Sequence, residues 1–147
     1  MTELRLGAND IRDEGAIAIA EALKVTAVLT NLDLRVNQIG DEGAKAIADS
    51  LKSGMAVLTT LSLWGNSIGD EGAIAIAEAL KVTAVLTTLN LGYNSIGVEG
   101  AKAIADSLKS GMAVLTKLDI RYNSMGDAGE QAVRDAVKDR SGFELHL

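Results

Sequence analysis

The chain has 147 residues, of which 48% are hydrophobic, and its formal net charge is −6 at neutral pH. That apolar fraction is enough to bury a core, whereas the negative charge repels a phosphate backbone and argues against nucleic acid as a partner. The sequence contains no cysteine and no apolar run of membrane-spanning length, which excludes disulfides, thiolate zinc sites, cysteine nucleophiles and a membrane-spanning helix. These features predict a cytoplasmic protein that does not bind a membrane.

One unit of about 28 residues occurs five times along the chain. The repeats span residues 1–28, 29–57, 58–85, 86–114 and 115–142, and a short terminal segment follows at 143–147. Self-similarity at a period of 20 to 50 residues is typical of solenoids, in which each unit stacks on its neighbours. We therefore predict a single repeat domain over residues 1–147.

The first half of each unit follows the pattern L-x-x-L-x-L-x-x-N-x-I. In the second copy, Leu32 and Leu34 alternate with polar residues, which predicts a short strand with one buried face. An asparagine recurs at one register after the strand, at Asn9, Asn37, Asn66, Asn94 and Asn123. Because an asparagine side chain can bond the backbone of a turn, we predict a structural ladder here rather than a ligand site.

The second half of each unit has helical periodicity. Its apolar stripe in the second copy comprises Ala44, Ile47, Ala48 and Leu51. An aspartate recurs at the expected helix start, where it favours capping and the helix dipole, at Asp13, Asp41, Asp70 and Asp127. Val98 occupies this position in the fourth copy, which predicts that the fourth helix has the weakest start. A glycine just inside each helix costs about 1 kcal/mol relative to alanine, so its recurrence predicts close backbone packing.

Alternation of strand, loop and helix places parallel strands side by side, since the helix provides the crossover that parallel strands need. Helices occupy more room than strands, so the stack is expected to curve with its strands inside. The predicted fold is therefore an α/β, right-handed β-α superhelix, with parallel strands on the concave face and helices on the convex face.

The run L-x-x-L-x-L-x-x-N-x-I-G-D-E-G-A-x-A-I-A closely resembles leucine-rich repeats of the ribonuclease-inhibitor type. The alternation of 28-residue and 29-residue units is also similar to that family, and the resemblance covers essentially the whole chain. It implies a horseshoe segment, a cytoplasmic location and a concave face that binds a protein. The chain departs from ribonuclease inhibitor in lacking cysteine and in having too few repeats to surround a ribonuclease, so no contact residue is carried over.

The two ends of the array differ. Glu130 and Arg134 replace alanines of the apolar stripe in the last copy, with the spacing of an i,i+4 ion pair, as a capping repeat requires. Residues 143–147 are predicted to form a sixth strand that ends the sheet. The N-terminus has no comparable cap, so its first strand is an open edge through which a second copy could associate. A piece of a longer protein and an engineered array both fit this asymmetry.

The differences between the copies are not spread evenly. Residues 13–30 are identical to residues 70–87, and residues 42–59 are identical to residues 99–116. Most substitutions fall instead in the strands and their exit loops, where, for example, Val36 corresponds to Tyr93. Duplication followed by drift would not spare the exposed helix positions, so the pattern favours a varied binding face on a constant frame.

Three of the four aromatic residues fall in two neighbouring columns at the ends of the strands. Trp, Tyr and Arg dominate interface hot spots. We predict a partner-binding site on the concave face at Arg35, Trp64, Tyr93, Arg121 and Tyr122, with Asp33 and Asp119 beside them. The alternative is that the aromatic rings only cover the loop backbone or stack on the arginines as cation–π pairs.

Catalytic chemistry has little support. His146 is expected beside Asp119 on the next strand, but Ser62 is two strands further away and metal ligands are too few. We therefore predict no enzyme activity, metal or cofactor, and protein recognition as the function. An engineered scaffold without a natural ligand is the main alternative. The repeats also resemble those of the Ran GTPase-activating protein, which uses a loop arginine; Arg12, which breaks a column of glycines, would then be its counterpart.

Overall fold

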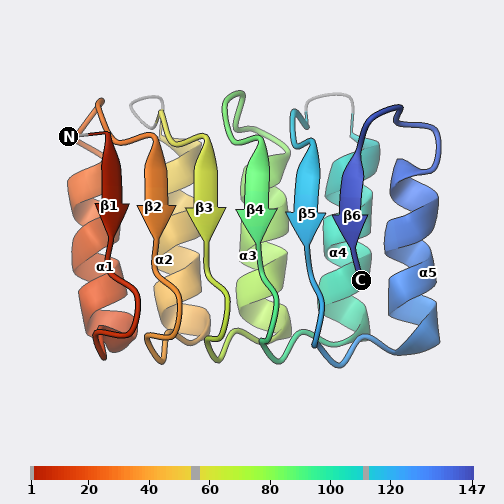
Figure 1. Ribbon diagram of the computed structural model, residues 1–147, viewed down its shortest axis with the longest axis horizontal. Coiled ribbons are helices and arrows are strands. Elements are labelled where there is room, and N and C mark those ends of the chain that lie inside the picture. The colour runs from red at the N-terminus through yellow and green to blue at the C-terminus, as the bar shows by residue number, and fades with distance from the viewer. Residues whose placement is uncertain (1, 54–56, 111–112) are drawn as a thin grey trace.

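The computed structural model describes residues 2–53, 57–110 and 113–147. These residues form a six-stranded parallel sheet in the order β1-β2-β3-β4-β5-β6, and Figure 1 shows the helices in a second layer behind it. The elements are β1 (Glu3–Arg5), α1 (Arg12–Leu23), β2 (Asn31–Asp33), α2 (Asp41–Lys52), β3 (Thr60–Ser62), α3 (Asp70–Leu80), β4 (Thr88–Asn90), α4 (Val98–Lys109), β5 (Lys117–Asp119), α5 (Gly126–Val137) and β6 (Glu144–His146). The predicted α/β solenoid and its sixth strand are confirmed.

The strand register places equivalent residues of successive repeats side by side. One column on the sheet face away from the helices, here called the open face, comprises Glu3, Asn31, Thr60, Thr88, Lys117 and Glu144. The second column comprises Arg5, Asp33, Ser62, Asn90, Asp119 and His146. Between them, a column of leucines points towards the helices, which is the alternation expected of a half-buried strand.

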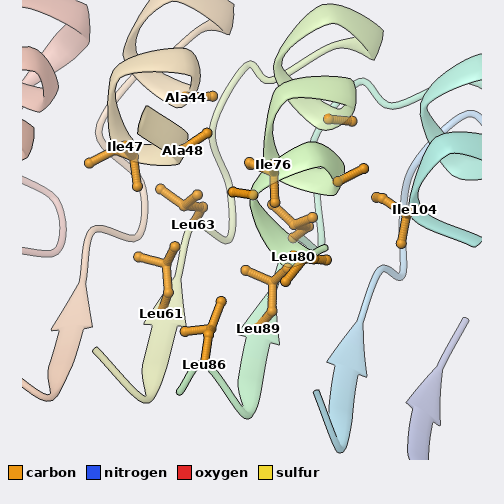
Figure 2. Packing of buried hydrophobic residues seen from close by; sticks show 14 of the residues in the cluster. Ala44, Ile47, Ala48, Leu61, Leu63, Ile76, Leu80, Leu86, Leu89 and Ile104 are labelled. Atoms are coloured by element: carbon orange, nitrogen blue, oxygen red, sulfur yellow. The ribbon is translucent and has the colours of Figure 1, made fainter. Parts of the chain in front are cut away.

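One continuous core runs along the array between the sheet and the helices. Figure 2 shows Ile47 and Ala48 of α2 above Leu61 of β3 and Leu63, which follows that strand, and all four side chains are buried. Alanines on the helices allow neighbouring helices to lie close together. The core therefore passes through every repeat and is not confined to one of them.

The recurring glycine in the first turn of each helix is explained by close packing, as predicted. A Cβ atom at Gly43 would lie 2.7 Å from Ile39 Cγ2, 2.7 Å from Asp13 Oδ1 and 3.0 Å from Ala16 Cβ. Real Cβ atoms do not approach backbone-anchored neighbours so closely without displacement of the neighbour. From α2 onward, the glycine thus allows each helix to rest directly on the preceding repeat.

The aspartates at the helix starts cap the following helix rather than their own. Asp41 Oδ1 accepts hydrogen bonds from the backbone N–H groups of Gly69, at 2.8 Å, and Gly72, at 2.9 Å, at the start of α3. Asp13 makes the same two bonds to α2, and Asp70 makes them to α4. Asp13, Asp41 and Asp70 therefore satisfy N–H groups that a helix terminus leaves unpaired, but across a repeat boundary.

The prediction that Val98 weakens the fourth helix is therefore wrong, because α4 receives its cap from Asp70. The missing carboxylate instead affects α5, the next helix along the chain. Gly126, at the start of α5, has a φ of +62°, whereas the equivalent Gly40 before α2 has a φ of −104°. Arg12, at the start of the likewise uncapped α1, has a φ of +59°. The conformation at each helix start thus follows the presence of the preceding aspartate.

The C-terminal repeat carries the polar contacts of a cap. Arg134 and Glu130 form the predicted ion pair at 3.5 Å, and the Arg140 guanidinium lies 4.9 Å from the centroid of the Phe143 ring. At the other end, β1 forms the edge of the sheet that the described residues build, with β2 beside it. Within the described part of the chain, no helix is both long enough and apolar enough to cross a membrane.

Candidate protein-binding ridge

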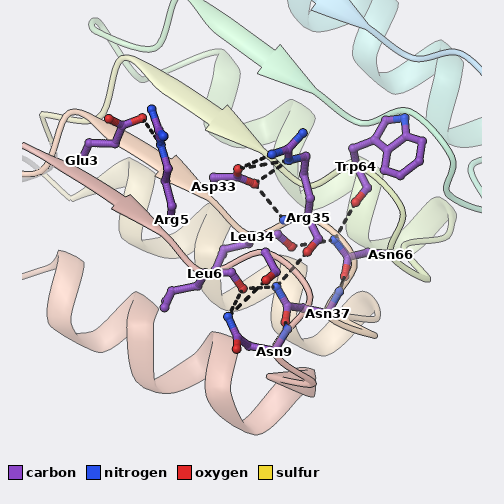
Figure 3. A network of polar contacts seen from close by, with 11 residues as sticks. Glu3, Arg5, Leu6, Asn9, Asp33, Leu34, Arg35, Asn37, Trp64 and Asn66 are labelled. Carbon is purple, nitrogen blue, oxygen red and sulfur yellow. Dashed lines mark hydrogen bonds and ion pairs between the residues drawn. The ribbon is translucent and has the colours of Figure 1, made fainter.

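Asparagine side chains hold the loops that leave the strands. Asn37 Nδ2 donates to the carbonyl oxygens of Leu6, at 2.9 Å, and Arg35, at 3.0 Å, while its Oδ1 accepts from the backbone N–H of Asn9 at 2.8 Å. Asn66 repeats the pattern towards the loop of the second copy, as Figure 3 shows. Asn94 and Asn123 continue it along the array. Each loop is thereby fixed to the preceding loop, which gives a regular platform for exposed side chains.

One column of these loops has a left-handed backbone in all five copies. Its members and φ angles are Ala8 (59°), Val36 (54°), Gly65 (72°), Tyr93 (56°) and Tyr122 (59°). Only glycine adopts this conformation freely, and other residues pay about 1–2 kcal/mol. Tyr93 and Tyr122 are nevertheless 57% and 66% exposed. Neither backbone preference nor burial therefore accounts for tyrosine at these two positions.

The aromatic rings contact one another across three successive loops. The centroids of Trp64 and Tyr93 are 5.2 Å apart, and those of Tyr93 and Tyr122 are 5.4 Å apart. These tilted pairs lie within the spacing at which aromatic rings attract. Trp64 also lies over the backbone of Gly92, where an added Cβ would be 2.7 Å from Trp64 Cδ1. The loop-covering interpretation thus describes Trp64 in part, but not the two tyrosines.

Each of the two arginines predicted for the site binds the aspartate that ends the strand before it. Arg35 Nη2 lies 2.9 Å from Asp33 Oδ2, and Arg121 Nη2 lies 2.8 Å from Asp119 Oδ2. The cation–π alternative predicted for these arginines does not occur among the described residues. Both guanidinium groups are instead held by these aspartates beside the loops that carry the aromatic rings. Because the arginine side chains are already fixed, binding of a partner would remove less side-chain entropy.

Asp119 is buried, and its ionisation depends on these neighbours. Burial alone would raise the pKa of the carboxyl group. Side-chain and backbone hydrogen bonds from Arg121, together with the positive charge of Arg121, outweigh burial and lower the pKa of Asp119 below its ordinary value of 3.8. The Asp119–Arg121 pair is therefore ionised at neutral pH.

Two depressions adjoin these side chains. One, of about 280 Å³, lies beside the Trp64 ring, and it is lined by Gly7, Ala8, Arg35, Val36 and Trp64. The other, of about 320 Å³, lies on the open face, where Asp119, His146 and Ser62 are among its lining residues. Val36, which lines the first depression, is not among the residues predicted for the site. Its place in the same column as Tyr93 and Tyr122 is the signal in the sequence that identifies it.

The structure places the predicted residues in one band along the strand ends, here called the ridge: Arg35, Trp64, Tyr93, Arg121 and Tyr122, with Asp33 and Asp119 at its base. Arg12 lies elsewhere, at the first residue of α1, where its guanidinium binds Asp10. His146 pairs in register with Asp119, and its Nε2 lies 2.8 Å from Glu144 Oε1. Among the described residues, no group of three or more His, Asp or Glu side chains could hold a metal ion.

The stacked strand–helix units with an asparagine ladder define a repeat solenoid. The model of the family described as Leucine Rich repeat matches residues 1–20, 27–48, 55–77, 84–105 and 112–133. The chain therefore belongs to the leucine-rich repeat family, as the sequence predicted. A search of curated protein sequences finds no match.

Two solved structures are similar to this chain. The segment called leiomodin-1 actin-binding site 2 is 28% identical, with a TM-score of 0.77 over 94% of this chain and 79% of that chain. The C-terminal domain of Caenorhabditis elegans tropomodulin is 13% identical, with a TM-score of 0.76 over 94% of this chain and 83% of that chain. The second similarity concerns the fold alone.

Proposed function

We propose that this chain is a non-catalytic protein-recognition module that binds its partner through the ridge. The observation that carries the proposal is the presence of Tyr93 and Tyr122, both exposed, at backbone positions that favour glycine. Unfavourable backbone conformations persist where the surrounding structure over-determines them, and they cluster at functional sites. Gly65 occupies the same column, so the loop itself does not require an aromatic side chain.

The composition and rigidity of the ridge suit an interface hot spot. Trp, Tyr and Arg are the residue types enriched in hot spots. Ring stacking and the aspartate–arginine pairs hold the side chains before a partner arrives, so binding removes less side-chain freedom. The hollow beside Trp64 offers a place for an apolar side chain of the partner.

Actin is the first purified protein to test as the partner. The leiomodin-1 segment, whose name describes an actin-binding site, resembles nearly the whole length of this chain. This candidate rests on similarity to one solved structure, whereas the ridge is argued from this chain's own residues. The two parts of the proposal can therefore succeed or fail separately.

The test compares three immobilised proteins in a cytoplasmic extract, with captured proteins quantified by mass spectrometry and purified actin assayed separately. The proteins are the parent, a ridge variant with Trp64→Ala, Tyr93→Ala and Tyr122→Ala, and a helix-face control with Ile17→Ala and Ile74→Ala. The two isoleucines of the control are 40% and 39% exposed, so the control variant also loses exposed apolar side chains. Circular dichroism checks that all three are folded.

We expect proteins that the parent and the control capture but the ridge variant loses. Equal capture by the ridge variant would contradict the proposed site. Capture of no specific protein by any of the three would favour a scaffold without a natural ligand.

A further inference from the structure

The first repeat exposes an apolar face at the end of the array. A hollow of about 190 Å³ opens there between β1 and α1, lined by Leu4, Ile19, Ala22, Leu23, Thr26, Val28 and Leu29. Figure 1 shows β1 and α1 at the end of the two layers, next to the N-terminus. Val28 is 56% exposed. An apolar end face of this kind is typical of a contact surface.

The third repeat shows how the same sequence behaves when it is covered. Residues 13–30 are identical to residues 70–87, and in the third repeat α2 packs against the equivalent side of α3. Ala79 is fully buried there, whereas its counterpart Ala22 is exposed. The end face of α1 is thus the same surface that the interior of the array buries between two helices.

No other described strand pairs with the outer edge of β1, where alternate residues direct their backbone groups. The Thr2 carbonyl accepts from Thr30 N–H, and Leu6 N–H donates to the Asp33 carbonyl, so these residues face β2. Because successive residues of a strand direct their N–H and C=O groups to opposite sides, Glu3 and Arg5 direct theirs outward. These groups form a template for another strand.

We propose that the chain forms a twofold homodimer in which β1 pairs antiparallel with β1 of a second copy about Leu4. In this register Glu3 of each copy lies opposite Arg5 of the other, and each such pair exchanges two backbone hydrogen bonds. Opposite charges then face each other on the open face, while the leucines and the end faces of α1 meet on the core side. A twofold interface joins the same patch of both copies, so the contact closes at two chains.

Charge complementarity selects this occupant. In the isolated chain, Arg5 Nε lies 2.9 Å from Glu3 Oε1, an exposed ion pair visible in Figure 3. The dimer exchanges the two pairs within the copies for two pairs between them, so every charge of this edge keeps an opposite charge as its neighbour. The inference does not depend on the ridge, which lies at the exit loops of β2 to β5.

Sedimentation velocity from micromolar to millimolar concentration tests the dimer on the whole chain. We expect a monomer–dimer equilibrium without larger species. The substitution Ala22→Lys, which places a charge in the end face, is expected to abolish dimerisation. The matched control Ala128→Lys, on the exposed surface of α5, leaves it unchanged.

Charge reversal tests the register. Glu3→Lys alone and Arg5→Glu alone each place like charges opposite one another, and we expect each to weaken dimerisation about tenfold. An equimolar mixture of these two variants restores opposite charges in both pairs, so a heterodimer is expected to form at the affinity of the parent.

A monomer at every concentration would overturn the proposal. Open-ended oligomers, a dimer insensitive to Ala22→Lys, or a mixture that fails to restore dimerisation would also overturn it.

Discussion

Replacement of Asp41 by alanine tests whether the aspartate column caps the next repeat. The carboxylate accepts two hydrogen bonds, at 2.8 and 2.9 Å, from the first turn of α3, and it also lies in the first turn of its own helix. Loss of a capping side chain costs about 0.5–2 kcal/mol, and hydrogen bonds to a charged group are at the stronger end. With the dipole contribution of about 0.3–1 kcal/mol, we expect Asp41→Ala to lower the free energy of unfolding by about 2–3 kcal/mol.

Asp127→Ala is the matched control. Asp127 has the same place in the first turn of α5, but β6 and not another helix follows it in the array. It therefore keeps only the dipole term, and its replacement is expected to cost less than about 1 kcal/mol. Urea denaturation of both variants gives the two values. Equal costs would refute capping across the repeat boundary and restore the interpretation that each aspartate serves its own helix.

Three further predictions concern stability and ionisation. Val98→Asp supplies the missing cap to α5, where Gly126 can change conformation, and is expected to raise the free energy of unfolding by about 1 kcal/mol, measured by urea denaturation. Gly72→Ala is expected to lower it by about 1–3 kcal/mol despite better helix propensity, because the added Cβ would lie 2.8 Å from an aspartate oxygen; an increase in the same assay would refute this packing. Arg121→Ala leaves burial unopposed by the guanidinium, so NMR titration is expected to show a higher pKa of Asp119. Since the parent pKa lies below 3.8, the stability that ionised Asp119 contributes is present above that value and lost as pH falls through the lowered pKa. The stability difference between parent and variant is therefore expected to shrink in strong acid; a pKa of Asp119 unchanged by the substitution would contradict the assigned cause.

Most of the fold was predictable because the same sequence pattern recurs in every repeat. The alternating leucines set the strand register, and the helical stripe of alanine and isoleucine identified the packed face. The columns of the open face followed directly, including the pairing of His146 with Asp119. The spacing of the leucines specifies the strand register, because a shift of one residue would turn all the buried leucines of a strand to the exposed face.

Two features depended on geometry between repeats, which the sequence of one unit does not contain. The aspartates occupied a position typical of a cap for their own helix, and only the stacking of α2 on α3 shows that Asp41 reaches Gly69 and Gly72. The left-handed backbone at Tyr93 and Tyr122 could not be predicted either, because Gly65 is the one glycine in that column of the sequence.

The central claim is that the tyrosines of the ridge are retained for recognition and not for stability. The most direct measurement is the free energy of unfolding of a Tyr93→Gly, Tyr122→Gly variant by urea denaturation. Relief of two left-handed positions offsets the loss of ring stacking, so we expect a value within about 1 kcal/mol of the parent. A fall of about 3 kcal/mol or more would show that the rings stabilise the fold, and it would contradict the account.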